Sequence, residues 1–202
     1  MIIMQTNRTC AAILIISMIA GCATVPPADR ELQSASWTRH QDKLSGLTVW
    51  EASGRISVRF KNEGWSASLQ WHQDKQEYFL RLIAPLGRGT YEITGDAEGV
   101  ALRTGRDEVI HARNPEILME ENLGWHVPLT GLVYWIRGLP VPGTRTDALL
   151  LDERGRMTDL RQSGWTVNYA SYADTGGYVL PGKIALNNEE LKVRLVIRDW
   201  KL

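Results

Sequence analysis

The feature that most constrains this chain is an alternation of apolar and polar side chains that begins near Val49. In the segment EASGRISVRF, for example, Ile56 and Val58 alternate with Arg55 and Ser57. A repeat of two residues is that of a β-strand, and polar side chains at every second position indicate that one face of the sheet meets water. The pattern therefore predicts an antiparallel sheet with one apolar and one wet face.

Turn-forming sequences divide this pattern into about eleven strands. Six strands run to Ala112 and are separated by KNEG, APLG, GDAEG and TGRD; five more begin at ALLLD, RMTDLRQ, GWTVNYAS, GKIAL and LKVRLVIRDW. No sequence repeat of fixed period is present, which argues against a propeller or a solenoid. We expect a single curved antiparallel sheet in one domain, within a mainly β fold that also contains helices (α+β).

Helices are predicted at two places. The stretch DRELQSASWTRHQDKLSGL, which contains no proline, is expected to form an N-terminal helix that faces the domain with Leu32, Trp37 and Leu44. In the middle of the chain, Asn114 is a good N-cap before Pro115, and Gly124 is expected to end that helix. A second short helix should follow Pro128, with one apolar face made of Leu129, Leu132, Val133 and Ile136.

The N-terminus has the pattern of a secretory signal. The segment AAILIISMIA is an apolar run of ten residues, too short to span a bilayer as a helix. It leads to Ile19-Ala20-Gly21-Cys22, which resembles the lipobox of bacterial lipoproteins. We expect residues 1–21 to be the signal peptide, Cys22 to carry covalent lipid, residues 22–28 to be a lipidated tether and residues 29–202 to be the domain. The alternative, an ordinary signal with an incidental cysteine, would leave one unpaired thiol in a secreted protein, which is uncommon.

Charge and motifs exclude several function classes. Loss of Arg8 with the signal leaves 22 basic against 23 acidic side chains, and no Lys/Arg cluster with interleaved aromatics occurs in the sequence, so nucleic acid is not expected as a partner. No metal-binding histidine spacing, G-x-S-x-G, S-x-x-K or phosphate-binding loop occurs, so we expect neither an enzyme nor a cofactor other than the lipid on Cys22. The 8 Trp and 6 Tyr would suit a ligand cavity or a membrane interface, but core packing explains them equally well.

The turn Pro85-Leu86-Gly87 places a leucine at a loop tip after an alternating strand. The residues alone leave two interpretations open, because isolated exposed leucines are ordinary and a functional leucine would look the same.

The ordered segments SWTRHQ, GRISVRF, LQWHQ, YFLRLIAPLG, LGWHVPLTGLVYWIRGLPVPG, GWTVNYASY and LVIRDW are together similar to the LolB family of outer-membrane lipoprotein receptors. The resemblance covers nearly the whole mature chain. It implies an incomplete β-barrel of eleven antiparallel strands, closed by a helical lid around an apolar cavity. It also implies a receptor that accepts lipoproteins from the periplasmic carrier LolA and inserts them into the inner leaflet of the outer membrane, without nucleotide. In that family an exposed leucine in a Pro-Leu-Gly loop serves membrane insertion, a role that would fall here to Pro85, Leu86 and Gly87.

Further expectations follow from this resemblance and from the strand pattern. The chain would be lipid-anchored in the outer membrane, would face the periplasm and would act as a monomer; Ala23, where retention in the inner membrane would favour Asp, agrees with that location. A structural lipoprotein that scaffolds an envelope assembly and a lipid-acting hydrolase are the alternatives. The acyl-chain cavity is expected to be lined by Ile56, Val58, Leu69, Trp71, Leu80, Leu82, Ile93, Leu132 and Ile136.

Overall fold

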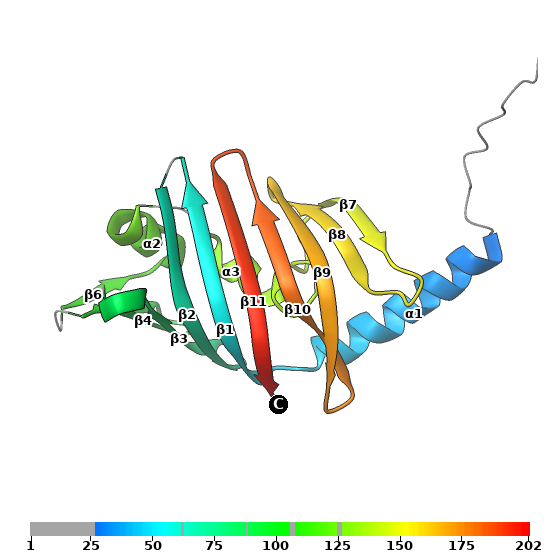
Figure 1. Ribbon diagram of the computed structural model, residues 1–202. Helices are drawn as coiled ribbons and strands as arrows, with labels where there is room; N and C mark the ends of the chain where they lie inside the picture. The colour runs from blue at the N-terminus through cyan, green and yellow to red at the C-terminus, as the bar shows by residue number, and fades with distance from the viewer. Residues whose placement is uncertain (1–26, 62, 88, 106–107, 125–126) are drawn as a thin grey trace, which may run out of the picture.

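An antiparallel sheet of eleven strands forms the body of the computed structural model, which describes residues 27–61, 63–87, 89–105, 108–124 and 127–202 (Figure 1). The strands are β1 Val49–Phe60, β2 Glu63–Asp74, β3 Glu77–Ile83, β4 Thr90–Gly95, β5 Val100–Thr104, β6 Val109–Ala112, β7 Thr146–Leu151, β8 Met157–Gln162, β9 Trp165–Thr175, β10 Tyr178–Asn187 and β11 Leu191–Lys201. Their number and antiparallel pairing confirm the fold class predicted from the sequence.

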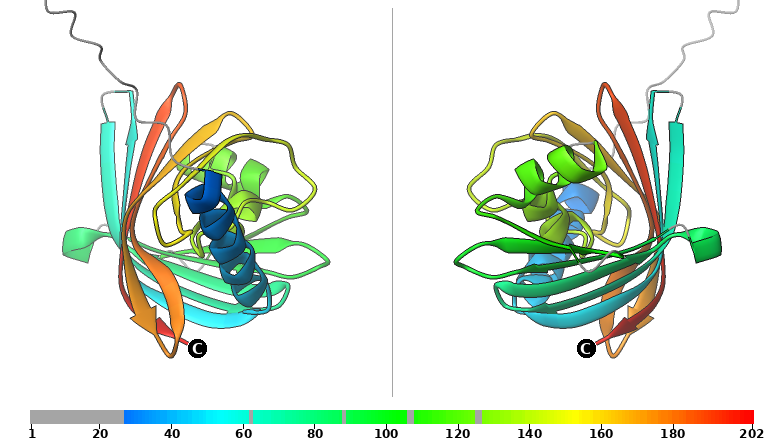
Figure 2. Two further views of the ribbon diagram at one scale, coloured as in Figure 1. Left: turned by 90° about the vertical axis from the view of Figure 1, so that its right-hand side faces the viewer. Right: turned by 90° about the vertical axis from the view of Figure 1, so that its left-hand side faces the viewer.

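The order of strands across the sheet is β6-β5-β4-β3-β2-β1-β11-β10-β9-β8-β7. Each half is a simple meander, and the halves are joined because the first strand pairs with the last: Ile56 of β1 lies opposite Leu195 of β11. Strands β6 and β7 are the two edges, with no pairing between them in the described part of the chain, so the barrel is incomplete. The chain between these edges supplies the two helices that lie within the curve of the sheet (Figure 2).

Gly54 allows β1 and β11 to approach closely where the pairing shifts by one residue. A Cβ atom at this position would lie 2.0 Å from the carbonyl oxygen of Val196, so only glycine fits. A bulge of this kind increases the local twist of a sheet. It contributes to the curvature that turns the apolar face inward.

Three α-helices are present in the described residues: α1 Pro27–Ser45, α2 Pro115–Leu123 and α3 Leu129–Trp135. They lie on the concave side of the sheet, whereas its outer face is uncovered (Figure 2). The predicted cap of α2 is confirmed, because the Asn114 side chain accepts hydrogen bonds from the amides of Glu116 and Ile117. The helix ends at Gly124, which has the left-handed conformation expected of a C-cap glycine.

Helix α1 differs in two ways from the expectation. It begins at Pro27, so Pro27 and Ala28, which were assigned to the tether, are helical; proline is well tolerated in a first helical turn. Leu44 is buried and Trp37 is half-buried, but Leu32 is 69% exposed, so its predicted contact with the domain is wrong. The reason is visible in Figure 1, where the first turns of α1 extend beyond the edge of the sheet.

The core lies between the concave face of the sheet and the helices. Alternate residues of every long strand enter it, as in β11, where Leu191, Val193, Leu195 and Ile197 are buried and the residues between them are exposed. Trp50 is almost fully buried and contacts the rings of Trp71 and Trp200, each with a centroid distance of 5.4 Å. The predicted inner and outer faces of the strands are therefore confirmed.

Candidate functional site

The loop between β3 and β4 carries the most exposed large apolar side chain of the described residues. It contains the short 3-10 turn η1 Pro85–Gly87 and is closed by a 3.0 Å hydrogen bond from the amide of Ala84 to the carbonyl of Gly89. Leu86 is 93% exposed and has φ 57° and ψ 34°. The left-handed region costs a leucine about 1–2 kcal/mol. An exposed apolar residue held in a strained conformation contributes little to the core, so the fold does not explain it.

Turn η1 projects from the outer face of the sheet. In Figure 2 the strands β1, β2 and β11 stand between η1 and the helices. The predicted insertion residues Pro85, Leu86 and Gly87 are thus together on one loop, separated by the wall of the sheet from the predicted cavity residues.

The nine predicted cavity residues gather on the opposite side of that wall. All of them are buried and belong to one continuous hydrophobic core. Trp71 lies opposite Leu80, which in turn lies opposite Ile93, so the strands β2, β3 and β4 present one apolar surface to the lid. Leu132 of α3 and Ile136, which caps it, complete the set. Contact of these residues with an acyl chain stays a prediction.

A hollow of about 410 Å³ opens between this surface and the helices, and we name it the lid hollow. Its apolar walls come from Trp71 and Tyr78 on the sheet and from Leu129, Val133 and Tyr134 on α3. The size falls within the usual range of small-ligand sites. Of the nine predicted residues Trp71 lines this hollow, and its indole nitrogen donates to Oε1 of Gln73 at 3.1 Å.

Tyr78 forms part of the floor of the lid hollow. Its ring lies over Gly95 on β4, where a Cβ atom would come within 2.2 Å of the ring. Burial, with smaller contributions from the charges of Glu116 and Asp96, raises the pKa of Tyr78 to about 12. The hydroxyl therefore stays neutral at physiological pH and adds no charge to the apolar walls.

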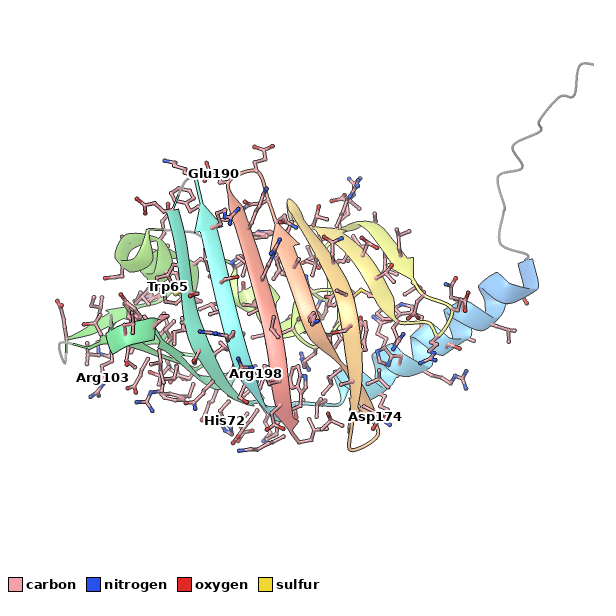
Figure 3. All side chains as sticks on the ribbon, viewed as in Figure 1. Trp65, His72, Arg103, Asp174, Glu190 and Arg198 are labelled. Atoms are coloured by element: carbon pink, nitrogen blue, oxygen red, sulfur yellow. The ribbon has the colours of Figure 1, made fainter. Side chains whose placement is uncertain are left out.

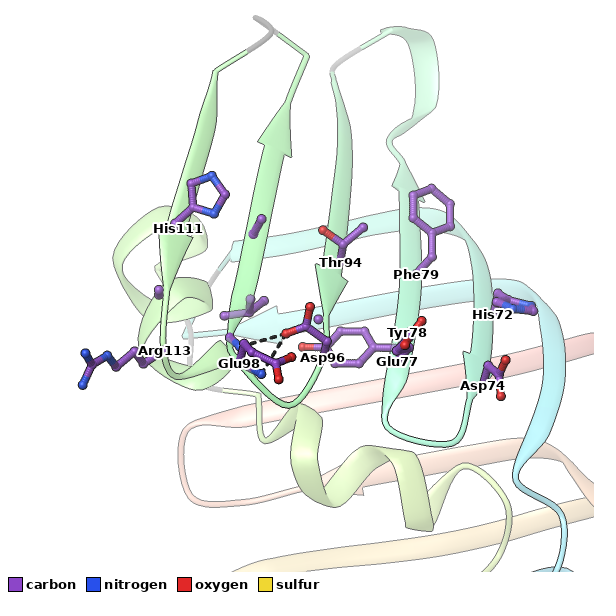
Figure 4. Close-up of a pocket in the computed structure, with 15 residues that line it drawn as sticks. His72, Asp74, Glu77, Tyr78, Phe79, Thr94, Asp96, Glu98, His111 and Arg113 are labelled. Atoms are coloured by element: carbon purple, nitrogen blue, oxygen red, sulfur yellow. Dashed lines mark hydrogen bonds between the residues drawn. The ribbon is translucent and has the colours of Figure 1, made fainter.

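A larger hollow of about 950 Å³ lies beside the β2–β3 and β4–β5 turns (Figure 4). Its lining is mixed, with several acidic side chains near Tyr78 and Phe79. The carboxylate of Asp96 accepts hydrogen bonds of 2.9 Å from the amides of Glu98 and Gly99, so it serves to close a turn. Within the described ranges, no group of three or more His, Cys, Asp and Glu residues could hold a metal ion. The acidic side chains make this mixed surface a poor match for an acyl chain.

Hydrogen bonds hold the two lid helices unequally. The buried side chain of Gln162 accepts from Nε1 of Trp135 at 3.1 Å, and the hydroxyl of Tyr169 donates to the carbonyl of Trp135 at 2.9 Å. Just beyond α3, the buried Arg137 donates to the carbonyl of Leu47 at 2.7 Å, and burial lowers the pKa of its guanidinium. The C-terminal end of α3 is therefore fixed to the sheet.

The side chain of Glu116 ties helix α2 to the other end of α3. Oε1 of the buried Glu116 accepts from the amide of Thr130 at 3.0 Å and from its hydroxyl at 2.8 Å. This joint links the N-termini of the two lid helices. The sequence analysis missed Glu116, Gln162 and Arg137, because polar side chains that bond distant backbone leave no periodic signal.

The predicted lipid attachment at Cys22 and the signal peptide lie outside the described residues. No helix of the described chain is long and apolar enough to cross a membrane.

Comparison with known proteins agrees with this architecture. Residues 48–200 match the family model for the outer membrane lipoprotein LolB. An outer-membrane lipoprotein LolB of Pseudomonas putida is 38% identical over 199 residues, covering 96% of each chain, and one of Stutzerimonas stutzeri is 39% identical over 188 residues, covering 91% of this chain and 90% of the relative.

Solved structures share the fold at low sequence identity. A LolA superfamily protein from Nitrosomonas europaea has a TM-score of 0.56 at 10% identity, covering 84% of this chain and 93% of its own. A putative outer membrane lipoprotein-sorting protein domain from Vibrio parahaemolyticus has a TM-score of 0.53 at 10% identity, covering 86% of this chain and 90% of its own. By its family match and its relatives, this chain belongs to the LolB family of outer membrane lipoproteins.

Proposed function

We propose that this LolB-family chain, whose role is lipoprotein localisation, accepts lipoproteins from the carrier LolA and releases them into the inner leaflet of the outer membrane. The transfer uses no nucleotide. A lipid on Cys22 anchors the chain to the outer membrane on its periplasmic side, residues 22–28 act as the tether, and residues 29–202 form one lipoprotein-binding domain. The chain acts as a monomer and not as an enzyme.

The chemistry of the cargo supports direct transfer between apolar sites. Three acyl chains of about fourteen methylenes each would cost on the order of 30 kcal/mol to expose to water, at about 0.8 kcal/mol per methylene. Free diffusion of the cargo is therefore excluded. A half-barrel whose inner face is apolar and whose lid is held partly by one joint offers the cargo a dry surface.

The nine predicted cavity residues are buried in the core of this structure. Acceptance of cargo therefore requires a lid helix to move away from the sheet. The lid hollow is the natural starting point, because it already separates α3 from Trp71 and Tyr78. We propose that the lid opens at the joint between Glu116 and Thr130, whereas Arg137 and Gln162 fix its other end. We propose that α2 moves and that the nine buried cavity residues then contact acyl chains.

The observation that carries the proposal is the exposed, left-handed Leu86 on the outer loop. A leucine at this position serves no packing role, but it can enter a bilayer. Transfer to the membrane then needs no energy source, provided that the acyl chains bind the bilayer more tightly than they bind the receptor.

The test mixes acyl-loaded LolA with the unlipidated chain of residues 23–202. Among the residues that the structure describes, all the buried hydrophobic side chains lie from Leu44 to Trp200, so this chain keeps that core. Cargo should move to it without ATP and should then leave it when liposomes are added. If cargo stays on LolA unless nucleotide is supplied, the proposal fails; if it never moves, the scaffold alternative is favoured.

A further inference from the structure

The outer face of the central sheet carries a cluster of cations that the function above does not use. Side chains of β1, β10 and β11 alternate between the core and this face, and the cations occupy exposed positions. The segments 52–60, 64–71, 178–187 and 191–198 contain no Asp or Glu. We name the cluster the basic face; it consists of Arg55, Arg59, Lys183, Lys192, Arg194 and Arg198.

These cations are left without acidic partners. None of the six forms an ion pair with an acidic residue in the part of the chain that the structure describes. Some exposed charges elsewhere are paired, as Arg81 is with Glu92 at 3.2 Å and Lys201 with Glu51 at 3.1 Å. The basic face is thus a surface of net positive charge on a chain whose formal net charge is zero.

Part of the basic face is hollowed. A depression of about 210 Å³ lies over β1, β2 and β11, where Arg59 pairs with Lys192 and Ser57 with Arg194 across the strands. Its lining also includes the hydroxyl groups of Ser57 and Ser66. Cations with hydroxyl donors match the oxygens of a phosphate group.

The basic face and Leu86 point to the same side of the molecule. Figure 2 shows η1 projecting from the side of β1, β2 and β11 that lies away from the helices. Figure 3 looks onto that side, where Arg198 is labelled on β11. A flat partner surface, such as that of a bilayer, can therefore contact Leu86 and the basic face at the same time.

We propose that the basic face binds the surface of a bilayer that contains anionic phospholipids, with a headgroup phosphate in the hollow between Arg59, Lys192 and Arg194. This contact directs the outer face of the sheet to the membrane and brings Leu86 into the bilayer. This proposal adds a membrane-binding surface to the function proposed above. Binding of the basic face to lipid does not depend on that function, but its purpose, the delivery of cargo, does. Each cation near an anionic surface contributes about a fivefold factor in membrane affinity, so three contribute about 100-fold.

The test measures binding of the unlipidated chain of residues 23–202 to liposomes by cosedimentation. One set of liposomes is phosphatidylcholine alone, and the other contains about 30% phosphatidylglycerol. The face variant carries Arg59→Gln, Lys192→Gln and Arg194→Gln. The matched control carries Arg39→Gln, Arg145→Gln and Arg154→Gln, which remove the same charge from exposed positions elsewhere. Thermal melts check that both variants remain folded.

We expect the parent chain to bind the anionic liposomes in a salt-sensitive manner and the face variant to lose about 100-fold in affinity, whereas the control loses little. Equal losses in both variants, or equal binding of the parent chain to both kinds of liposome, would overturn the proposal. A face variant that binds liposomes normally but no longer accepts cargo from LolA would also overturn it, because the cations would then serve the carrier. Failure of the proposed function is distinguishable, since it would leave the parent chain without cargo in the transfer assay.

Discussion

Leu86→Glu is expected to separate stability from function. Leu86 is 93% exposed, so its replacement removes almost no buried surface. Exposed substitutions usually change the free energy of unfolding by no more than about 0.5 kcal/mol. The left-handed backbone is already a cost in the parent chain, and glutamate, which is not β-branched, meets the same cost. The variant should therefore melt within a few degrees of the parent.

The effect on membrane contact should be much larger. Burying a leucine side chain yields about 1.5–3 kcal/mol, and here nearly all of it is available to the bilayer. This corresponds to a factor of roughly 10–150 in membrane affinity. A carboxylate at the tip loses this gain and resists entry into an apolar phase. Acceptance of cargo should persist, because the core lies on the other side of the sheet, so cargo should accumulate on the receptor.

The assay follows labelled cargo in two stages, from LolA to the receptor and then from the receptor to liposomes. Leu86→Met keeps an apolar tip and should deliver normally. Leu150→Glu is the matched control, since Leu150 is a 58% exposed leucine on the edge strand β7, far from the loop. Normal delivery by Leu86→Glu, or a loss of several kcal/mol in stability, would refute the reasoning.

Three further perturbations test the lid and the N-terminal helix. Glu116→Ala should leave the amide of Thr130 without its acceptor, cost about 1–3 kcal/mol and raise hydrogen exchange in α2 more than in α3; equal exchange in both helices would contradict the unequal attachment. Gln162→Ala removes the acceptor of Trp135 Nε1 and of the Val141 amide. It should lower the free energy of unfolding, measured by denaturant titration, by about 3–5 kcal/mol. A loss below about 1 kcal/mol would contradict this expectation. Burial, and next the charge of Arg156, lowers the pKa of His40 below 6.5, so the unfolded chain binds a proton more readily and stability is lost as pH falls through 6.5. His40→Gln should therefore flatten the stability profile between pH 7 and 5, and an unchanged profile would argue against His40 as the cause.

Much of the fold could be predicted because its signals are local. The alternation in the strands follows from the repeat of the β backbone, and the cap at Asn114 depends on amides two and three residues away. The exposure of Leu86 belongs to the same class, since a Pro-Leu-Gly turn at a strand end leaves its central side chain outside. These features need no knowledge of distant parts of the chain.

Other features depended on the tertiary structure. The pairing of β1 with β11 joins the ends of the chain, and no property of either strand specifies that partner or the bulge at Gly54. Inward position was predicted for residues such as Leu69 and Ile93, but periodicity cannot tell whether an inward residue lines a space or fills one. That depends on how closely the lid packs on the sheet, which Gln162 and Arg137 determine through bonds to distant backbone.

The basic face is the clearest case of a property that only the folded chain possesses. Arg55 and Arg59 lie more than 120 positions before Lys183 and Arg194, and within each strand they are ordinary solvent-exposed residues. The sequence by itself determined that these cations face outward, because a strand exposes every second side chain. The sheet decided that they lie together and on the side of Leu86, because strand order, register and curvature are set by contacts between segments far apart in the chain.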